Sequence, residues 1–189
     1  MKEIIKMLVV LTGISGVCGL LLAGVRDFTK DRIQEQELTY VKGPAVMAVL
    51  EGCDNDPIKD RVEVEVDGET VIVFIGKKEG APWAVAYETR SAGFGGDIGV
   101  MMGVNLNDPT LAGIGITTHK ETPGVGSRVT EPDFRKIFKG KPLDSPFKII
   151  DDGGVVDAIS GATVSSRAVC AAVTKGVGCF DKIKANVTQ

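Results

Sequence analysis

The hydrophobic positions of the chain fall into three patterns, and each predicts a different structure. Residues 7–25 form an apolar run without a single charge. Between residues 62 and 119, apolar and polar residues alternate in short runs, which is typical of half-buried strands. After Thr163, apolar residues recur at the spacing of an amphipathic helix. The chain is therefore expected to begin with an apolar helix, continue as a sheet and close with a helix.

The apolar run from Met7 to Val25 has the length of a membrane span, because as a helix it would cover roughly 29 Å. A cleavable signal peptide is the alternative, but its apolar region is normally shorter and ends at a cleavage site of small residues. The sequence LLLAG at the end of this run lacks such a site. We expect residues 1–25 to be retained as a membrane anchor.

Basic residues flank the apolar run on both sides, so a count of charges does not decide its orientation. Lys2 and Lys6 lie on a short N-terminal tail, and tails of this kind usually stay in the cytoplasm. This argument predicts a single crossing of the inner (cytoplasmic) membrane, with residues 26–189 on the outer face.

The segments before the alternating region predict helices. Residues 26–42 are polar and predict a linker helix that continues out of the membrane. The sequence GPAVMAVLEG predicts a short helix that starts at Pro44 and ends near Gly52. The folded domain is then expected to cover residues 43–189.

The alternating region predicts an antiparallel meander of strands. Asp67-Gly68 separates two alternating runs, which is the signal of a two-residue hairpin. Residues 106–109, LNDP, have the composition of a turn. The expected strands are VEVEV and ETVIVFIGK on either side of the hairpin turn, followed by WAVAYETRS, IGVMMGVN and LAGIGITTH.

The last third of the chain completes an α+β fold. EPDFRKIFKGK predicts a short helix, FKIID and VVDAIS are candidates for late strands, and the closing helix is expected from Val164 to Cys179. The fold class is thus a mainly antiparallel sheet with flanking helices, plus one N-terminal transmembrane helix.

Charge and cysteine content exclude several classes of function. The net charge is -3, the pI is about 5.3, and no basic run is interleaved with aromatic residues, so a nucleic-acid-binding surface is not expected. None of the four cysteines forms a C-x-x-C pair, and there is one histidine, so neither an iron–sulfur cluster nor another metal site is expected from this chain alone. Cys170 and Cys179 are expected to fill space in the core.

The stretch DAISGATVSSRAV, residues 157–169, carries more hydroxyl groups than one helix cap needs. The hydroxyl residues are Ser160, Thr163, Ser165 and Ser166. An N-cap at Ser160 or Thr163 accounts for one of them. Gly161 and Ala162 leave the approach to Thr163 open, and small residues, free N–H groups and hydroxyl donors at a helix N-terminus suit an anionic phosphate.

The common nucleotide motifs are absent from the sequence. It contains neither G-x-G-x-x-G after a strand nor G-x-x-x-x-G-K-[ST]. The chain is therefore not expected to bind NADH itself.

DAISGAT resembles the D-x-x-[ST]-G-A-T signature of the FMN-binding domain family, in which FMN is joined through its phosphate to the threonine hydroxyl. The resemblance implies a covalent FMN phosphoester on Thr163, with Ser160, Gly161, Ala162, Ser165 and Ser166 around it. It also implies that Asp157 belongs to the signature read by a flavin transferase, a magnesium-requiring enzyme that attaches FMN from FAD.

Two further stretches are similar to the same family. HKETPGVGSRV, residues 119–129, resembles the H-x-E-T-P-G-[LV]-G motif, and SAGFGGDIGVMMGVN, residues 91–105, resembles the glycine-rich strand that precedes it. These motifs occur in the G subunit of the Rnf complex and in the C subunit of the sodium-pumping NADH:quinone oxidoreductase. The short chain and its compact region before the sheet favour the Rnf type.

Residues of these two stretches have both a structural and a functional interpretation. His119 at a strand end is either a hydrogen-bonded structural residue or a neighbour of the flavin. Glu121 and Thr122 are either a solvated loop pair or polar contacts to the isoalloxazine edge, and the resemblance favours the contacts. Glycines in a strand mark a bulge or the close approach of a ligand. The glycines concerned are Gly93, Gly95 and Gly96.

The resemblance implies an electron-transfer flavoprotein subunit of a membrane ion-translocating ferredoxin:NAD oxidoreductase. In this role the chain is part of an oxidoreductase and translocase but is not catalytic alone, because its electron donor and acceptor belong to partner subunits. Two alternatives stay open at this stage. One is the C-type subunit of the sodium pump, and the other is a membrane-anchored, non-catalytic binding or scaffold domain in which SGAT is merely a helix cap.

Overall fold

The structure is a computed structural model that describes residues 1–187, the side chains of residues 31 and 34 excepted. The chain divides into two compact units, which meet between Leu38 and Thr39. This division falls inside the predicted linker helix, residues 26–42.

The first unit is a single helix, α1 (Lys2–Gln36). Its part from Lys2 to Lys30 is long and apolar enough to cross a membrane, with a mean hydropathy of 2.3 over the most apolar window, and none of that window is buried. The helix does not break at the end of the apolar run, which agrees with the predicted polar continuation. A short π-helical segment, η1 (Glu37–Lys42), follows.

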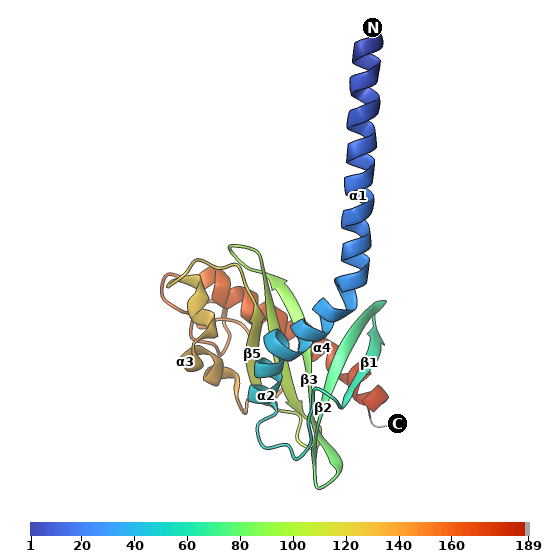
Figure 1. Ribbon diagram of the computed structural model, residues 1–189. Helices are drawn as coiled ribbons and strands as arrows, with labels where there is room; N and C mark the ends of the chain where they lie inside the picture. Colours follow the sequence, from blue (N-terminus) through green and yellow to red (C-terminus); the bar gives the residue numbers. More distant parts are fainter. Residues whose placement is uncertain (188–189) are drawn as a thin grey trace. The chain divides into compact units, whose positions relative to one another are not determined.

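The second unit is built on a five-stranded antiparallel sheet with the strand order β1-β2-β3-β4-β5. This is the predicted meander (Figure 1). A short helix, α2 (Gly43–Val49), precedes the sheet and has Pro44 in its first turn, as expected. The strands are β1 (Arg61–Val66), β2 (Glu69–Lys78), β3 (Ala81–Ala92), β4 (Asp97–Asn105) and β5 (Leu111–Thr118).

The turn between β1 and β2 confirms the hairpin prediction. Asp67 and Gly68 both have positive φ angles, +54° and +82°, as a type I′ turn requires. This turn matches the right-handed twist of the two strands and sets the register in which Val66 faces Glu69.

The sheet is covered on both faces by helices, and neighbouring residues of β4 show how. A Cβ on Gly103 would lie 2.8 Å from the carbonyl oxygen of Val49 in α2, so the glycine allows this helix to approach. Met102 points the other way, and its Cε would lie 2.8 Å from a Cβ on Gly176 in the closing helix α4 (Thr163–Val187). Side chains alternate between faces along a strand, so α2 and α4 lie on opposite faces.

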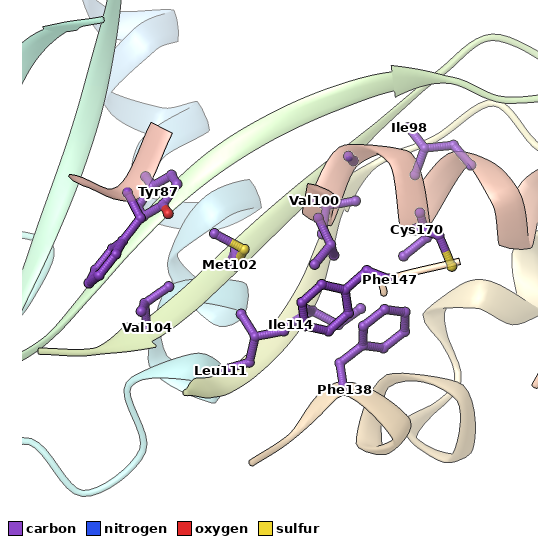
Figure 2. Packing of buried hydrophobic residues seen from close by; sticks show 14 of the residues in the cluster. Tyr87, Ile98, Val100, Met102, Val104, Leu111, Ile114, Phe138, Phe147 and Cys170 are labelled. Atoms are coloured by element: carbon purple, nitrogen blue, oxygen red, sulfur yellow. The ribbon is translucent and has the colours of Figure 1, made fainter. Parts of the chain in front are cut away.

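The core lies between the sheet and α4. Figure 2 shows Met102 and Val100 of β4 on the same side as Cys170 of α4, with the rings of Phe138 and Phe147 below them. The two rings are stacked at 6.3 Å between centroids. Burial raises the pKa of the Cys170 thiol to about 12, so this residue fills space as predicted.

The structure corrects two predictions in the last third of the chain. FKIID and VVDAIS are not strands, because only one parallel bridge, Ile149 to Val156, joins them, and a turn of 3₁₀ helix, η4 (Ile150–Asp152), lies between. Gly153, with φ +79°, ends that turn. The segment folds back on itself too tightly for two strands to run.

The closing helix also differs from the prediction, since α4 runs to Val187 rather than ending at Cys179. Gly176 and Gly178 suggest a helix end in the sequence, but Phe180 and Ile183 beyond them are buried and continue the apolar face. The predicted short helix is present as α3 (Pro132–Arg135) and a 3₁₀ turn, η3 (Lys136–Phe138).

Candidate functional site

Three loops that are far apart in the sequence meet at the N-terminus of α4. They are the β3–β4 loop at residues 93–96, the segment after β5 that leads into η2 (Gly126–Thr130), and residues 157–162. A cavity of about 290 Å³ lies between them. It is lined by Phe94, Glu121, Thr122, Val125, Gly126, Gly161, Ala162, Thr163, Val164 and Ser165.

Thr163 is the first residue of α4 and lines this cavity half-buried. Gly161 before it has a φ angle of +80°, a conformation that glycine adopts without strain, and Ala162 adds only a methyl group. An α-helix leaves the N–H groups of its first turn without partners inside the helix, and here those of Thr163, Val164 and Ser165 belong to that turn. The threonine hydroxyl is thus placed where an anion is favoured.

Glu121 connects the three loops. Its side chain is buried, with the residue 5% exposed. Its Oε1 accepts a hydrogen bond from the backbone N–H of Gly95 at 3.0 Å, and its Oε2 accepts one from the hydroxyl of Ser165 at 2.5 Å. Glu121 therefore ties the β3–β4 loop to the first turn of α4.

The Glu121 carboxyl is held in its ionised form. Burial by itself raises the pKa, but hydrogen bonds from Ser165 and from the backbone N–H groups of Gly95 and Phe94, with a smaller effect of His119, outweigh it and leave the pKa below its ordinary value. A fixed negative charge thus lies at the base of the cavity.

Ser165 and Ser166 build the site from within. Ser165 donates its hydroxyl hydrogen to Glu121, and Ser166, which is fully buried, donates to the carbonyl oxygen of Ala162 at 3.0 Å and accepts from the N–H of Ile159 at 3.1 Å. Their hydroxyl groups stabilise the loop that presents Thr163. Residues 157–169 therefore hold more hydroxyl groups than a helix cap needs because two of these groups stabilise the loop itself.

Gly93, Gly95 and Gly96 lie in the β3–β4 loop and not within a strand. A Cβ on Gly95 would lie 2.0 Å from the carbonyl oxygen of Lys120, and one on Gly93 would lie 2.4 Å from Oε1 of Glu121. Gly96 has a φ angle of +150°. These glycines allow the segment around Glu121 to approach closely, and Gly95 and Gly96 do not line the cavity.

Four other predicted site residues lie outside the cavity lining, and one of them is the buried Ser166. His119 follows the end of β5 and is exposed, and Ser160 and Asp157 are exposed on the loop before α4. Thr122, in contrast, lines the cavity, and its carbonyl oxygen accepts from the N–H of Ser127 at 3.1 Å.

Sequence reasoning missed the apolar residues at the rim of the cavity. Phe94 is 74% exposed, and Val125 and Val164 are 43% and 47% exposed. A signal was present in the sequence, because GFGG places an aromatic residue in a glycine turn where a polar residue is usual. Exposed apolar side chains around a cavity indicate a surface that a ligand or partner covers.

The residues of this cavity fit FMN. A helix N-terminus with a hydroxyl suits its phosphate, and an apolar rim suits its flat ring system. At about 290 Å³ the cavity is at the lower end of ligand pockets, which often have about 300–1,000 Å³, so a ring bound here would stay partly exposed. Among the described residues no group of three or more metal-ligating side chains comes together.

Comparison with known proteins identifies the class. Residues 93–178, which contain all three loops, match the family model described as the FMN-binding domain. The G subunit of the ion-translocating oxidoreductase complex of Cereibacter sphaeroides is 34% identical over 181 residues, covering 90% of this chain and 81% of that protein. The protein of the same name from Methanosarcina acetivorans is 32% identical over 178 residues, covering 93% and 94%.

The fold agrees with solved structures. The C subunit of the Na(+)-translocating NADH-quinone reductase from Parabacteroides distasonis superimposes with a TM-score of 0.60, at 19% identity, over 81% of this chain and 94% of that one. Shewanella oneidensis NqrC gives a TM-score of 0.54 at 25% identity, over 72% and 71%. The chain belongs to the family of FMN-binding-domain G subunits of ion-translocating oxidoreductase complexes.

Proposed function

We propose that this chain carries FMN covalently on Thr163 and relays electrons within a membrane-bound, ion-translocating ferredoxin:NAD oxidoreductase complex. The observation that carries the proposal is the position of Thr163, which opens α4 and lines a cavity behind the small residues Gly161 and Ala162. The family to which the chain belongs supports both the cofactor and the assembly.

The attachment is a phosphoryl transfer to the Thr163 hydroxyl. A flavin transferase would supply FAD, and Thr163 would be the acceptor. Its oxygen would form a bond to the phosphorus on the flavin side of the pyrophosphate, AMP would leave, and the hydroxyl proton would pass to a base of the transferase. One P–O bond forms and one breaks, and no redox change occurs. Asp157 of the signature is exposed, which supports its proposed recognition by that enzyme.

Bound FMN would supply one- and two-electron redox chemistry, whereas the chain's own residues hold and orient it. Phe94, Val125 and Val164 would contact the ring from the rim, and the first turn of α4 would hold the phosphate. Glu121 positions both elements through Gly95 and Ser165. The covalent bond removes the dissociation equilibrium, so the cofactor stays bound in every redox state.

The electron donor and acceptor are assigned to partner subunits. The sequence has no dinucleotide-binding glycine motif and no cysteine pair for a cluster. We assign α1 as the membrane anchor because of its length and apolar composition, and we assign the FMN domain to the outer face because short lysine-bearing tails usually stay in the cytoplasm.

Fluorescence on a denaturing gel tests the assignment, with the protein produced beside a flavin transferase. Wild type should give a fluorescent band, and Thr163→Ala should give none, because it removes the acceptor oxygen. Thr130→Ala is the matched control, since it removes an exposed threonine hydroxyl outside both the DAISGAT signature and the cavity lining, and it should stay fluorescent. A fluorescent Thr163→Ala band would refute the site, and a dark wild-type band would favour the scaffold alternative.

A further inference from the structure

The strands β2 and β3 pair over only part of their length. Their register runs from Lys78 opposite Ala81 to Val73 opposite Tyr87 and ends there. Residues 69–72 of β2 continue beyond this point paired with β1, and residues 88–92 of β3 continue paired with β4. The sheet therefore divides into a fork, which Figure 1 shows as the β1–β2 hairpin diverging from β3.

The hairpin is held away from β3 by contacts with the second half of α4. Lys182 pairs with Asp67 at the hairpin turn, and Lys175 lies 4.0 Å from the Glu69 carboxylate. Val64 and Val66 of β1 are 4% exposed and belong to the same buried cluster as Phe180 and Ile183 of α4. Packing of β1 against α4 thus fixes the fork, which is not a frayed strand end, and the exposed ion pairs add little to it.

Main-chain groups face each other across the fork. The N–H of Ile75 donates to the carbonyl oxygen of Asp60, so the main-chain groups of Ile75 point toward the β1 side of β2. These groups alternate in direction along a strand, so the N–H and C=O of Thr70, five residues earlier, point toward β3. The carbonyl oxygen of Trp83 accepts from the N–H of Leu106, so the main-chain groups of Trp83 point toward the β4 side of β3. By the same alternation, the N–H and C=O of Arg90, seven residues later, point toward β2. Within the described residues, no register pair joins Thr70 to Arg90.

A cavity of about 400 Å³ occupies the fork. Its strand walls include Thr70, Ile72 and Arg90, and α4 contributes Lys175, Cys179 and Ile183. On the opposite side Lys42 pairs with Glu88 at 2.7 Å. The cavity shares no lining residue with the one at Thr163, so it belongs to a different surface of the domain.

We propose that the fork binds an extended segment of another polypeptide of the complex, which adds a strand between β2 and β3. Two facing strand edges offer donors and acceptors at the repeat of an extended main chain, and strand addition is a general mode of peptide recognition. Side chains of the added strand would alternate between the apolar side at Cys179 and Ile183 and the charged side at Lys42 and Glu88. The inference rests on the proposed assembly into a multisubunit complex.

Amide hydrogen exchange tests the added strand directly, comparing the full-length chain in detergent with the purified complex. The amides of Thr70 and Arg90 should exchange on the order of tenfold or more slowly in the complex, because they gain hydrogen-bond partners there. The Phe74 amide, within the paired part of β2, should be protected in both states. Unchanged exchange at Thr70 and Arg90 in an intact complex would overturn the inference.

A pair of proline variants gives an independent test. Thr70→Pro removes an N–H that faces the fork, so the isolated chain should keep its fold and its covalent flavin while the yield of assembled complex falls at least several-fold. Val71→Pro is the comparison, because its N–H points to β1 and its loss should disturb the fold itself. Full assembly of a folded Thr70→Pro chain would contradict the proposal.

A photo-crosslinker at Arg90 in the purified complex identifies the occupant. A crosslink to another subunit supports the proposal, whereas a crosslink between two copies of this chain, or only to lipid, overturns it. If the chain does not enter a complex at all, the proposed function fails. If it enters the complex with flavin but Thr70 and Arg90 stay unprotected, only the strand-addition inference fails.

Discussion

At the scale of single residues, Glu121 has a structural role that the sequence did not indicate, while its contact to the isoalloxazine edge stays a prediction. Its two carboxylate oxygens receive the N–H of Gly95 and the hydroxyl of Ser165, and the residue is 5% exposed. A buried carboxylate is retained only where such donors offset its desolvation. Glu121 thus joins the β3–β4 loop to α4, and in the proposed flavin site it would be a positioning residue.

Replacing Glu121 by Gln should destabilise the fold by about 1.5–3 kcal/mol at pH 7, because the charge-assisted hydrogen bonds are lost and the amide offers one acceptor oxygen where the carboxylate offers two. Chemical denaturation measures this difference. The exposed Glu63→Gln on β1 is the control and should change the free energy of unfolding by less than about 0.5 kcal/mol.

The same variant has a defined pH dependence. The pKa of Glu121 is lower in the folded state than its ordinary value of 4.5, so its contribution is present above that value and lost as the pH falls through the lower folded pKa. The difference in free energy of unfolding between wild type and Glu121→Gln should therefore shrink below about pH 4.5. A difference that stays constant or grows in acid would contradict the assignment of the carboxylate.

The sequence predicted a helix from Val164 with Ser160 or Thr163 as its cap, and α4 begins one residue earlier, at Thr163. The sequence did not distinguish the roles of the neighbouring residues. Small residues and hydroxyls are visible in a sequence, whereas the direction of each hydroxyl depends on contacts made in three dimensions. Ser165 and Ser166 were expected around the phosphate, yet Glu121 and Ala162 receive their hydroxyl hydrogens. The rim residue Phe94 was missed because exposure of an apolar side chain cannot be read from periodicity.

At the scale of elements, the conformation of the β3–β4 loop depends on its close contact with the segment around Lys120. Gly95→Ala should destabilise the protein by about 1–3 kcal/mol, since its Cβ would lie 2.0 Å from a backbone oxygen of Lys120. Gly113→Ala on β5 is the matched control, because no heavy atom lies within 4 Å of the added carbon, and it should be neutral or slightly stabilising. Equal thermal stability of the two variants would show that the approach is not tight.

Sequence patterns predicted correctly the elements whose conformation depends on neighbouring residues. They gave wrong predictions where contacts between residues far apart in the sequence determine the conformation. The Asp67-Gly68 turn and the alternating strands were correct because turn chemistry and periodicity are properties of neighbouring residues. FKIID and VVDAIS have the composition of strands, but the tight turn between them prevents a ladder. The fork between β2 and β3 carries no local signal, since α4 holds the hairpin from elsewhere in the sequence.

At the scale of the whole molecule, the proposed anchored domain with a partly exposed flavin would depend on partner subunits for its electrons. The purified, flavinylated chain should accept electrons from dithionite but should not oxidise NADH at an appreciable rate. Stopped-flow absorbance of the flavin measures both reactions. Rapid bleaching by NADH would reveal a nicotinamide site in this chain.

The predicted orientation can be tested with an impermeant thiol reagent on intact cells. Cys53 is half-buried, and its sulfur donates to the carbonyl of Asn55, so it is a poor reporter. The reporter is a cysteine introduced at the exposed Asp144, in a chain whose native cysteines are replaced by serine. When the reagent can reach the outer face of the inner membrane, this cysteine should be labelled without lysis of the cells. Labelling only after lysis would place the domain in the cytoplasm.

The central claim is the bond between FMN and Thr163, and mass spectrometry of the proteolytic peptide that contains α4's first turn tests it most directly. In protein produced beside a flavin transferase, this peptide should gain the mass of one FMN less one water, and fragmentation should place the gain on Thr163. The account would be contradicted if the peptide keeps its unmodified mass, or if the flavin is found on Ser160, Ser165 or Ser166 instead.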